Sequence, residues 1–372
     1  MLILCVLCGI IFFSLKLTIS ILILFASISS AAQDKSSSFF IGTQAHYGFI
    51  IAHTAKIEPV SHTNPYGFEL NFNWLHTSFD SWKVFRAYNI SGFRLAYFDY
   101  QNPEIVGRSY LLTAYTEPII KRGGRFIFSV RGGGGISYQT KIYDYKNNDL
   151  NRFFGTKISF PLHLSANFKY GISDNLFLTL SGNYNHISNG AMRLPNMGIN
   201  FPTASLGLEL YPGSFPALDR GYAGGENSRL RQSFILVQAI TGYKVVYDIP
   251  TWSWGVSSRF TRQLRTFYAI NAGFELIMDK GIQKVIEIEE RNVDYKRFAL
   301  TAGQDFFFGR IVFSHHLGLY LYSPYKAKNP VYQKYELAYR IRPDFLAGVY
   351  LKAHTSDAEL FGFSVNYIIR LR

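Results

Sequence analysis

Apolar and polar residues alternate with a period of two in one segment after another of this chain. Such alternation places one kind of side chain on each face of a β-strand. Most of the segments have about ten residues, the length that a tilted strand needs to cross a membrane. About sixteen strands are predicted on this basis. They lie near residues 38–51, 66–76, 91–100, 109–118, 125–140, 157–170, 176–188, 199–211, 231–245, 252–263, 266–277, 296–308, 311–322, 332–342, 345–353 and 359–371.

The segment 176–188 shows which environment the alternation indicates. One face carries Leu176, Leu178 and Leu180, and the other is mostly polar, with Thr179 and Asn183 among its residues. In a soluble β-sandwich the apolar face would form the core, whereas in a transmembrane barrel it faces lipid. Strand length and aromatic content disfavour the sandwich. The predicted fold is therefore all-β, a single closed transmembrane antiparallel β-barrel of about 14–16 strands that occupies residues 33–372.

Composition supports a membrane barrel. The 372 residues include 26 Tyr and 33 Phe, so aromatic residues make up 17% of the chain, and charged residues make up only 17%. Aromatic girdles at both membrane interfaces are typical of such barrels. Residues 1–32 are predicted to be a signal peptide, because apolar runs surround Lys16 and small residues precede Gln33. The only cysteines, Cys5 and Cys8, lie in this segment, so the mature chain has no disulfide or thiol chemistry.

The connections between predicted strands differ in length. Short turns lie near 171–175, 308–310 and 342–344, and longer polar loops lie near 52–65, 141–156, 278–295 and 323–331. Short turns are typical of the periplasmic end of an outer-membrane barrel, which predicts that the loop 189–198 lies at the outer leaflet. The connection 212–231 does not fit this scheme, because it is long and rich in Gly and Pro yet falls at the periplasmic end.

The chain is basic. Its formal charge of +13 becomes +12 when residues 1–32 are removed, because they contain one Lys and no acidic residue. Basic proteins commonly bind nucleic acids or anionic lipids. Here the basic residues are scattered through short loops and strand ends, without a basic helix or a zinc module. A phosphorylated lipid in the membrane is therefore the predicted partner, and nucleic acid is not.

The candidate chemistry lies in two short stretches, residues 185–190 (Asn-His-Ile-Ser-Asn-Gly) and 195–200 (Pro-Asn-Met-Gly-Ile-Asn). His186 and Ser188 continue the apolar face of one predicted strand, and Asn200 lies on the corresponding face of the next. If the two strands form a hairpin, the three side chains project to the same side. That arrangement suits a nucleophile, a general base and an orienting group.

These two stretches resemble the signature of the outer-membrane lipid A 3-O-deacylases, also described as acyloxyacyl-hydrolase-like proteins. The resemblance covers roughly residues 125–210 and needs both stretches around one loop. It implies that His186 is the general base and Ser188 the nucleophile, and that Asn189 and Asn196 help to hold the oxyanion. The catalytic acid of the family is a Glu, and the matching position here is Asn200.

Other short motifs are given structural interpretations. His315 and His316 are adjacent on a predicted strand, so they point to opposite faces and cannot share one metal ion. The glycines after Arg131 resemble a phosphate loop only superficially, because no Gly-Lys-Ser/Thr ending follows. A second His-x-Ser, His354 and Ser356, lies on the parity that points to the barrel interior or into a loop, where membrane lipid has poor access.

The sequence thus predicts an enzyme of the bacterial outer membrane that removes an ester-linked acyl chain from lipid A, at position 3 by the family resemblance, with lipopolysaccharide of the outer leaflet as its substrate. No cofactor and no metal are predicted. The alternative is a catalytically inactive outer-membrane barrel that acts as a channel, adhesin or structural protein.

Overall fold

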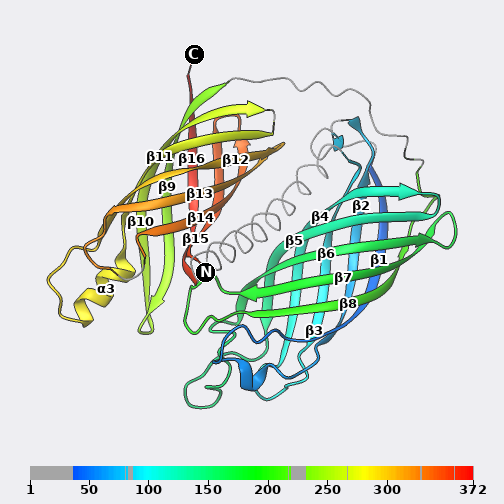
Figure 1. Cartoon of the computed structure of the whole chain (residues 1–372), viewed down its shortest axis with the longest axis horizontal. Coiled ribbons are helices and arrows are strands. Elements are labelled where there is room, and N and C mark those ends of the chain that lie inside the picture. Colours follow the sequence, from blue (N-terminus) through cyan, green and yellow to red (C-terminus); the bar gives the residue numbers. More distant parts are fainter. Residues whose placement is uncertain are drawn as a thin grey trace, which may run out of the picture. The chain divides into compact units, whose positions relative to one another are not determined.

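The computed structural model describes residues 37–79, 81–82, 87–216, 218, 232–265, 267–326, 329–355 and 357–371 (Figure 1). The predicted signal peptide, residues 1–32, lies outside the described residues. Among the residues described, no helix is long and apolar enough to cross a membrane.

All sixteen predicted strands are present, with boundaries that differ by only a few residues from the predicted ones. The strands are β1 Ser37–Gly48, β2 Tyr66–His76, β3 Asn89–Asp99, β4 Arg108–Gly123, β5 Phe126–Gln139, β6 Ile158–Gly171, β7 Leu176–Ser188, β8 Ile199–Leu210, β9 Ser233–Val246, β10 Ile249–Arg265, β11 Tyr268–Met278, β12 Lys296–Phe308, β13 Ile311–Tyr322, β14 Val331–Arg342, β15 Phe345–His354 and β16 Asp357–Arg370. The short 3-10 helix η1 (Glu58–Val60) and the α-helix α3 (Lys280–Ile288) lie in loops.

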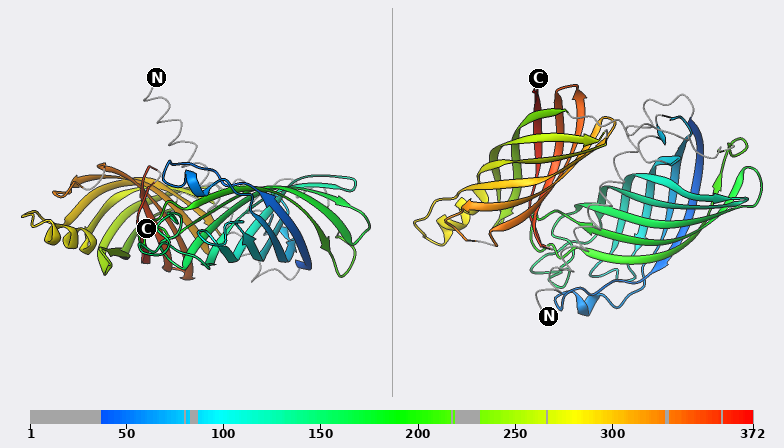
Figure 2. Two further views of the ribbon diagram at one scale, coloured as in Figure 1. Left: turned by 90° about the horizontal axis from the view of Figure 1, so that it is seen from below. Right: turned by 45° about the horizontal axis from the view of Figure 1, so that its top comes forward.

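The prediction of a single barrel is wrong, because the strands form two closed barrels of eight. In the first, β8 pairs with β7 and also with β1, from Ile41 opposite Leu210 to Gly48 opposite Thr203. In the second, β9 pairs with both β10 and β16. Figure 2 shows the strands of each barrel following one another in sequence order. The connection 212–231, which did not fit one barrel, joins the last strand of the first barrel to the first strand of the second.

Outward and inward faces follow the period-2 pattern. Along β7 the side chains alternate between exposed and buried, with Leu178 and Leu180 exposed and Thr179 and Ser181 buried. A closed eight-stranded barrel is only wide enough for its inward side chains to fill it. The polar face of each strand therefore becomes the interior, and the apolar face becomes the outer wall.

Buried ion pairs fill the interior of the first barrel. Arg94 and Arg131 both pair with Glu69, and Lys169 pairs with Glu117 at 2.6 Å. All five side chains are almost fully buried. Charges removed from water require partners in this way, because an unpaired buried charge is very costly. This packing disfavours a wide aqueous channel through the barrel.

The second barrel has its own buried charge network. Glu275 accepts from the ammonium groups of Lys334 and Lys352, and Arg297 pairs with Glu359. Each barrel therefore has an interior of its own, stabilised by contacts among its own strands.

Candidate active site

The β7–β8 hairpin places the candidate residues side by side. In the antiparallel register His186 lies directly opposite Asn200, and Ser188 follows two residues later on the same face as His186. All three side chains are half-buried on the outward face, whereas their strand neighbours Asn185 and Ile187 are buried. The predicted hairpin and the predicted sharing of one face are both observed.

The imidazole of His186 bridges the other two side chains. Its Nδ1 lies 2.7 Å from Oδ1 of Asn200, and its Nε2 lies 3.0 Å from Oγ of Ser188. Because an amide oxygen only accepts hydrogen bonds, Nδ1 carries the proton and donates to Asn200. Nε2 is then unprotonated, and it accepts the hydrogen bond from the Ser188 hydroxyl. A neutral base next to a hydroxyl is the arrangement that activates a serine nucleophile.

The loop after β7 contains two further candidate residues, Asn189 and Asn196. The backbone N–H of Asn189 donates to Oδ1 of Asn196 at 2.8 Å, which ties the two ends of the loop together. Gly190 and Gly198 have φ values of +64° and +68°, a region that favours glycine. A Cβ at Gly198 would lie 2.9 Å from Cε1 of His186, so only glycine lets the loop approach the ring so closely.

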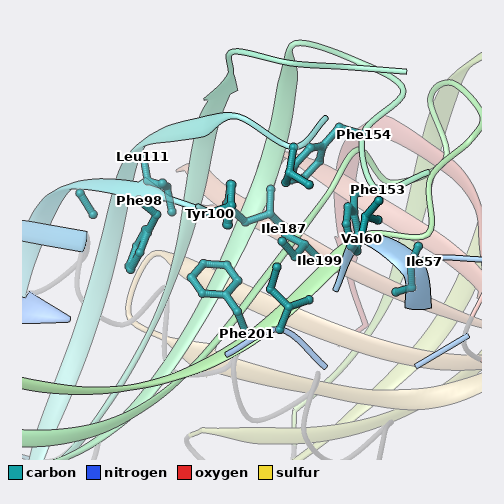
Figure 3. Close-up of a cluster of buried hydrophobic side chains, with 13 residues drawn as sticks. Ile57, Val60, Phe98, Tyr100, Leu111, Phe153, Phe154, Ile187, Ile199 and Phe201 are labelled. Carbon is teal, nitrogen blue, oxygen red and sulfur yellow. The ribbon is translucent and has the colours of Figure 1, made fainter. Parts of the chain in front are cut away.

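An apolar cluster fixes the base of this loop from the inner side of the wall (Figure 3). Ile187 and Ile199, the neighbours of the candidate residues along β7 and β8, are fully buried there with Phe153. Phe153 belongs to the loop between β5 and β6, and its carbonyl accepts from the N–H of Gly198 at 3.2 Å. The neighbouring carbonyl of Arg152 accepts from Met197 at 3.1 Å. The β5–β6 loop therefore holds residues 197–198 against the hairpin.

The structure adds a residue that the sequence did not indicate. His53, in the loop between β1 and β2, has its Nδ1 3.1 Å from Nδ2 of Asn200 and its Nε2 3.1 Å from the carbonyl oxygen of Met197. Tyr184, on the same face of β7, donates its hydroxyl to Oδ1 of Asn200 at 3.0 Å. His53 belongs to no motif and to no alternating segment, so no signal in the sequence could have connected it with Asn200.

Two family models match this chain. The model described as lipid A 3-O-deacylase (PagL) matches residues 66–209, and the model described as acyloxyacyl hydrolase, C-terminal domain, matches residues 232–371. Together they span most of both barrels. The chain belongs to the lipid A 3-O-deacylase family. It is thus a protein of the bacterial outer membrane, and its family is one of acyl-ester hydrolases that act on lipid A.

The family match extends well beyond residues 125–210, which carry the sequence resemblance, and it includes the second barrel. A search of curated proteins finds no match. Among solved structures, Neisserial surface protein A (NspA) is 10% identical over 48% of this chain and 99% of its own, with a TM-score of 0.33. The KdgM porin is 8% identical over 69% of this chain and 91% of its own, with a TM-score of 0.19. A mutant of the Rh. blastica porin is 9% identical over 90% of this chain and 100% of its own, with a TM-score of 0.20.

In this member of the lipid A 3-O-deacylase family, the histidines of the other sequence motifs contact neighbouring side chains of the second barrel. His316 is buried inside the second barrel, whereas His315 on the opposite face stacks on Tyr335, so the two do not converge. Within the described residues, no group of three or more His, Cys, Asp or Glu side chains is arranged to hold a metal ion. His354 points to the interior, where it lies 2.9 Å from Glu359. Its motif partner Ser356 lies outside the described residues.

The glycine run after Arg131 is part of a strand and not a phosphate loop. Residues 126–139 form β5, and Arg131 belongs to the buried charge network of the first barrel. A Cβ at Gly135 would lie 2.0 Å from the carbonyl oxygen of Leu112 on the adjacent strand. The glycine therefore permits close approach of β4 and β5.

Proposed function

We propose that this protein hydrolyses the ester-linked acyl chain at position 3 of lipid A by a serine mechanism at the outer wall of the first barrel. The observation that carries the proposal is the His186 ring, which bridges Oγ of Ser188 and Oδ1 of Asn200 at 3.0 and 2.7 Å. One nitrogen of this ring faces a nucleophile and the other faces an orienting acceptor, which is the geometry of a nucleophile and its base.

The reaction follows from these positions. Nε2 of His186 takes the proton of Ser188 while Oγ attacks the ester carbonyl, and a tetrahedral oxyanion forms. As the oxyanion collapses, the bond to the sugar oxygen breaks, and His186 returns the proton to that oxygen. The acyl group is then bound to Ser188. A water molecule, deprotonated by His186, releases the fatty acid and restores the serine hydroxyl.

Asn196 is the proposed oxyanion donor, and Asn189 is proposed to support it. Because Oδ1 of Asn196 already accepts from the backbone of Asn189, the Asn196 side chain donates through Nδ2. We assign Asn189 the part of holding that amide in place. A fixed donor near the developing negative charge contributes a large share of such rate enhancements, about 100- to 1,000-fold for one donor.

Substrate access supports a lipid-facing site. The three residues lie on the outward face of the hairpin, above a stripe of exposed apolar residues on β7 that includes Leu178 and Leu180. Acyl chains in a membrane lie against such a wall. The loops that follow β1, β3, β5 and β7 are at the same end of the barrel as the site, and long loops are typical of the outer-leaflet end. Lipid A reaches the site by lateral diffusion.

The test is mass spectrometry of lipid A incubated with the protein in mixed detergent micelles. The parent protein is expected to release one acyl chain, which fragmentation assigns to position 3. Ser188→Ala and His186→Ala are each expected to abolish the release, because a nucleophile and its base act as a unit. Ser173→Ala, in the exposed turn between β6 and β7, is the matched control and should behave as the parent.

Three outcomes would contradict the proposal. Release that persists in Ser188→Ala would exclude this nucleophile, and loss of release in Ser356→Ala alone would favour the second His-x-Ser. A folded parent protein that leaves lipid A unchanged would favour the inactive barrel instead.

A further inference from the structure

The side-chain amide of Asn200 must be held in one of its two orientations, which a carboxylate at this position would not require. A carboxylate has two equivalent acceptor oxygens, whereas an amide has one accepting oxygen and one donating nitrogen. Only the orientation with Oδ1 towards His186 makes Nδ1 the protonated nitrogen and leaves Nε2 free to accept from Ser188. The reversed amide would enforce the opposite tautomer, which in a serine triad can cost about four orders of magnitude in rate.

His53 lies against the other end of this amide. Its Nε2 is 3.1 Å from the carbonyl oxygen of Met197, and a carbonyl can only accept, so Nε2 carries the proton. Its Nδ1 is then an acceptor, and Nδ2 of Asn200 donates to it at 3.1 Å. With Nδ2 engaged in this way, Oδ1 of Asn200 must face His186.

The opposite tautomer of His53 is disfavoured by the same contacts. Protonated at Nδ1, the ring could donate to the carbonyl of Ile51, but over a longer distance of 3.3 Å. Its bare Nε2 would then face the Met197 oxygen, and its N–H would face the N–H of Asn200. One contact would then bring two acceptors together and the other two donors, and both hydrogen bonds would be lost.

Main-chain bonds hold His53 at this position although its side chain is exposed. The N–H of Phe49 donates to the carbonyl of Pro202 at 3.2 Å, and the N–H of Ile51 donates to the carbonyl of Asn200 at 2.8 Å. These bonds continue the pairing of β1 with β8 beyond the end of the strand. They anchor the start of the loop two residues before His53, next to the side chain that it contacts.

We propose that His53 is a positioning residue, which holds Asn200 in the one orientation that a carboxylate at this position would not need. The Met197 carbonyl fixes the tautomer of His53, and His53 fixes the orientation of the Asn200 amide. Asn200 in turn fixes the tautomer of His186. The inference rests on the proposed function of Ser188 and His186. It extends that site from three residues to a chain of four side chains, one of them contributed by a loop more than a hundred residues away in sequence.

The experiment is a double-mutant comparison of kcat and KM for acyl release from lipid A in micelles. His53→Ala is expected to lower kcat at least about twofold with little change in KM, because an amide that is no longer held leaves about half of the molecules with the wrong tautomer. His53→Gln should restore most of the rate, since its amide can accept from Asn200 and donate to Met197. In the Asn200→Glu background, His53→Ala should have a much smaller effect, because a carboxylate needs no fixed orientation.

The control is His62→Ala in the same loop, where the exposed ring contacts Glu58 and not Asn200. It should leave kcat unchanged. An equal loss from His53→Ala in both backgrounds would show that His53 acts only on loop structure and would overturn the inference, as would a His53→Ala variant that matches the parent. If Ser188→Ala is inactive in either of those cases, the proposed function stands and only the role of His53 fails.

Discussion

The side-chain oxygen of Asn200 lies 2.7 Å from Nδ1 of His186, across a directly opposed pair of residues on β7 and β8. An amide oxygen in this place fixes the tautomer and direction of the imidazole. In the proposed mechanism a positive charge develops on the ring as Ser188 attacks, and an amide, unlike a carboxylate, cannot neutralise that charge. The site therefore has the orientation of a serine triad without its full electrostatic support.

The first prediction concerns this position. Asn200→Glu is expected to maintain or raise kcat, because the carboxylate keeps the hydrogen bond to Nδ1 and adds charge stabilisation of the imidazolium. Asn200→Ala should lower kcat, because Nδ1 of His186 then loses the acceptor that fixes the tautomer and orientation of the ring. Both rates can be measured by fatty acid release from lipid A, with folding checked by heat-dependent migration on a gel. If Asn200→Ala were as active as the parent, another residue would have to orient His186.

The second prediction concerns Gly198, where a side chain would push against His186. Gly198→Ala is expected to lower kcat about 100-fold, the scale of loss caused by displacing a catalytic group by about 1 Å. Gly124→Ala is the matched control. Gly124 also has a positive φ, +58°, but a Cβ there would meet nothing within 4 Å. That variant should lose about 1 kcal/mol of stability and keep its activity. Equal activities of the two variants would contradict the packing argument.

The third prediction concerns the charged interior of the first barrel. Lys169 lies 2.6 Å from Glu117 and 2.7 Å from Glu209. Lys169→Met removes one of the two buried cations that pair with both carboxylates, the other being Arg131, so it should lower the free energy of unfolding by about 3–5 kcal/mol. Urea unfolding from micelles, followed by tryptophan fluorescence, measures this change. The exposed Lys157 provides the control, since Lys157→Met should change stability by less than about 0.5 kcal/mol.

The fourth prediction follows from the two separate closures. Because β8 pairs with β1, a chain of residues 33–220 contains every pairing of the first barrel. It should fold in detergent into a heat-modifiable barrel and retain acyl release, since Ser188, His186 and Asn200 all lie within it. Failure of this chain to fold, while residues 232–371 added separately restore it, would show that the first barrel depends on the second.

The sequence by itself determined the strands and their faces. The alternation in residues 176–188 is a local property, because successive side chains of any strand point to opposite sides. It identified all sixteen strands and placed His186 and Ser188 on the outward face. The short distance along the chain between β7 and β8 also made it predictable that His186 and Asn200 lie near each other on one face, since a hairpin needs only one loop.

Only the tertiary structure decided which strands close the barrels and what supports Asn200. Closure of β8 on β1 is a pairing between distant segments, and the alternation is the same whether eight strands close or sixteen do. The long connection 212–231 was the one local sign of the division. His53 reaches Asn200 for the same reason, because β1–β8 closure brings the β1–β2 loop to the start of β8. Contacts that form only through barrel closure cannot be predicted from the alternation of apolar and polar residues, because they depend on pairing between strands that are far apart in the sequence.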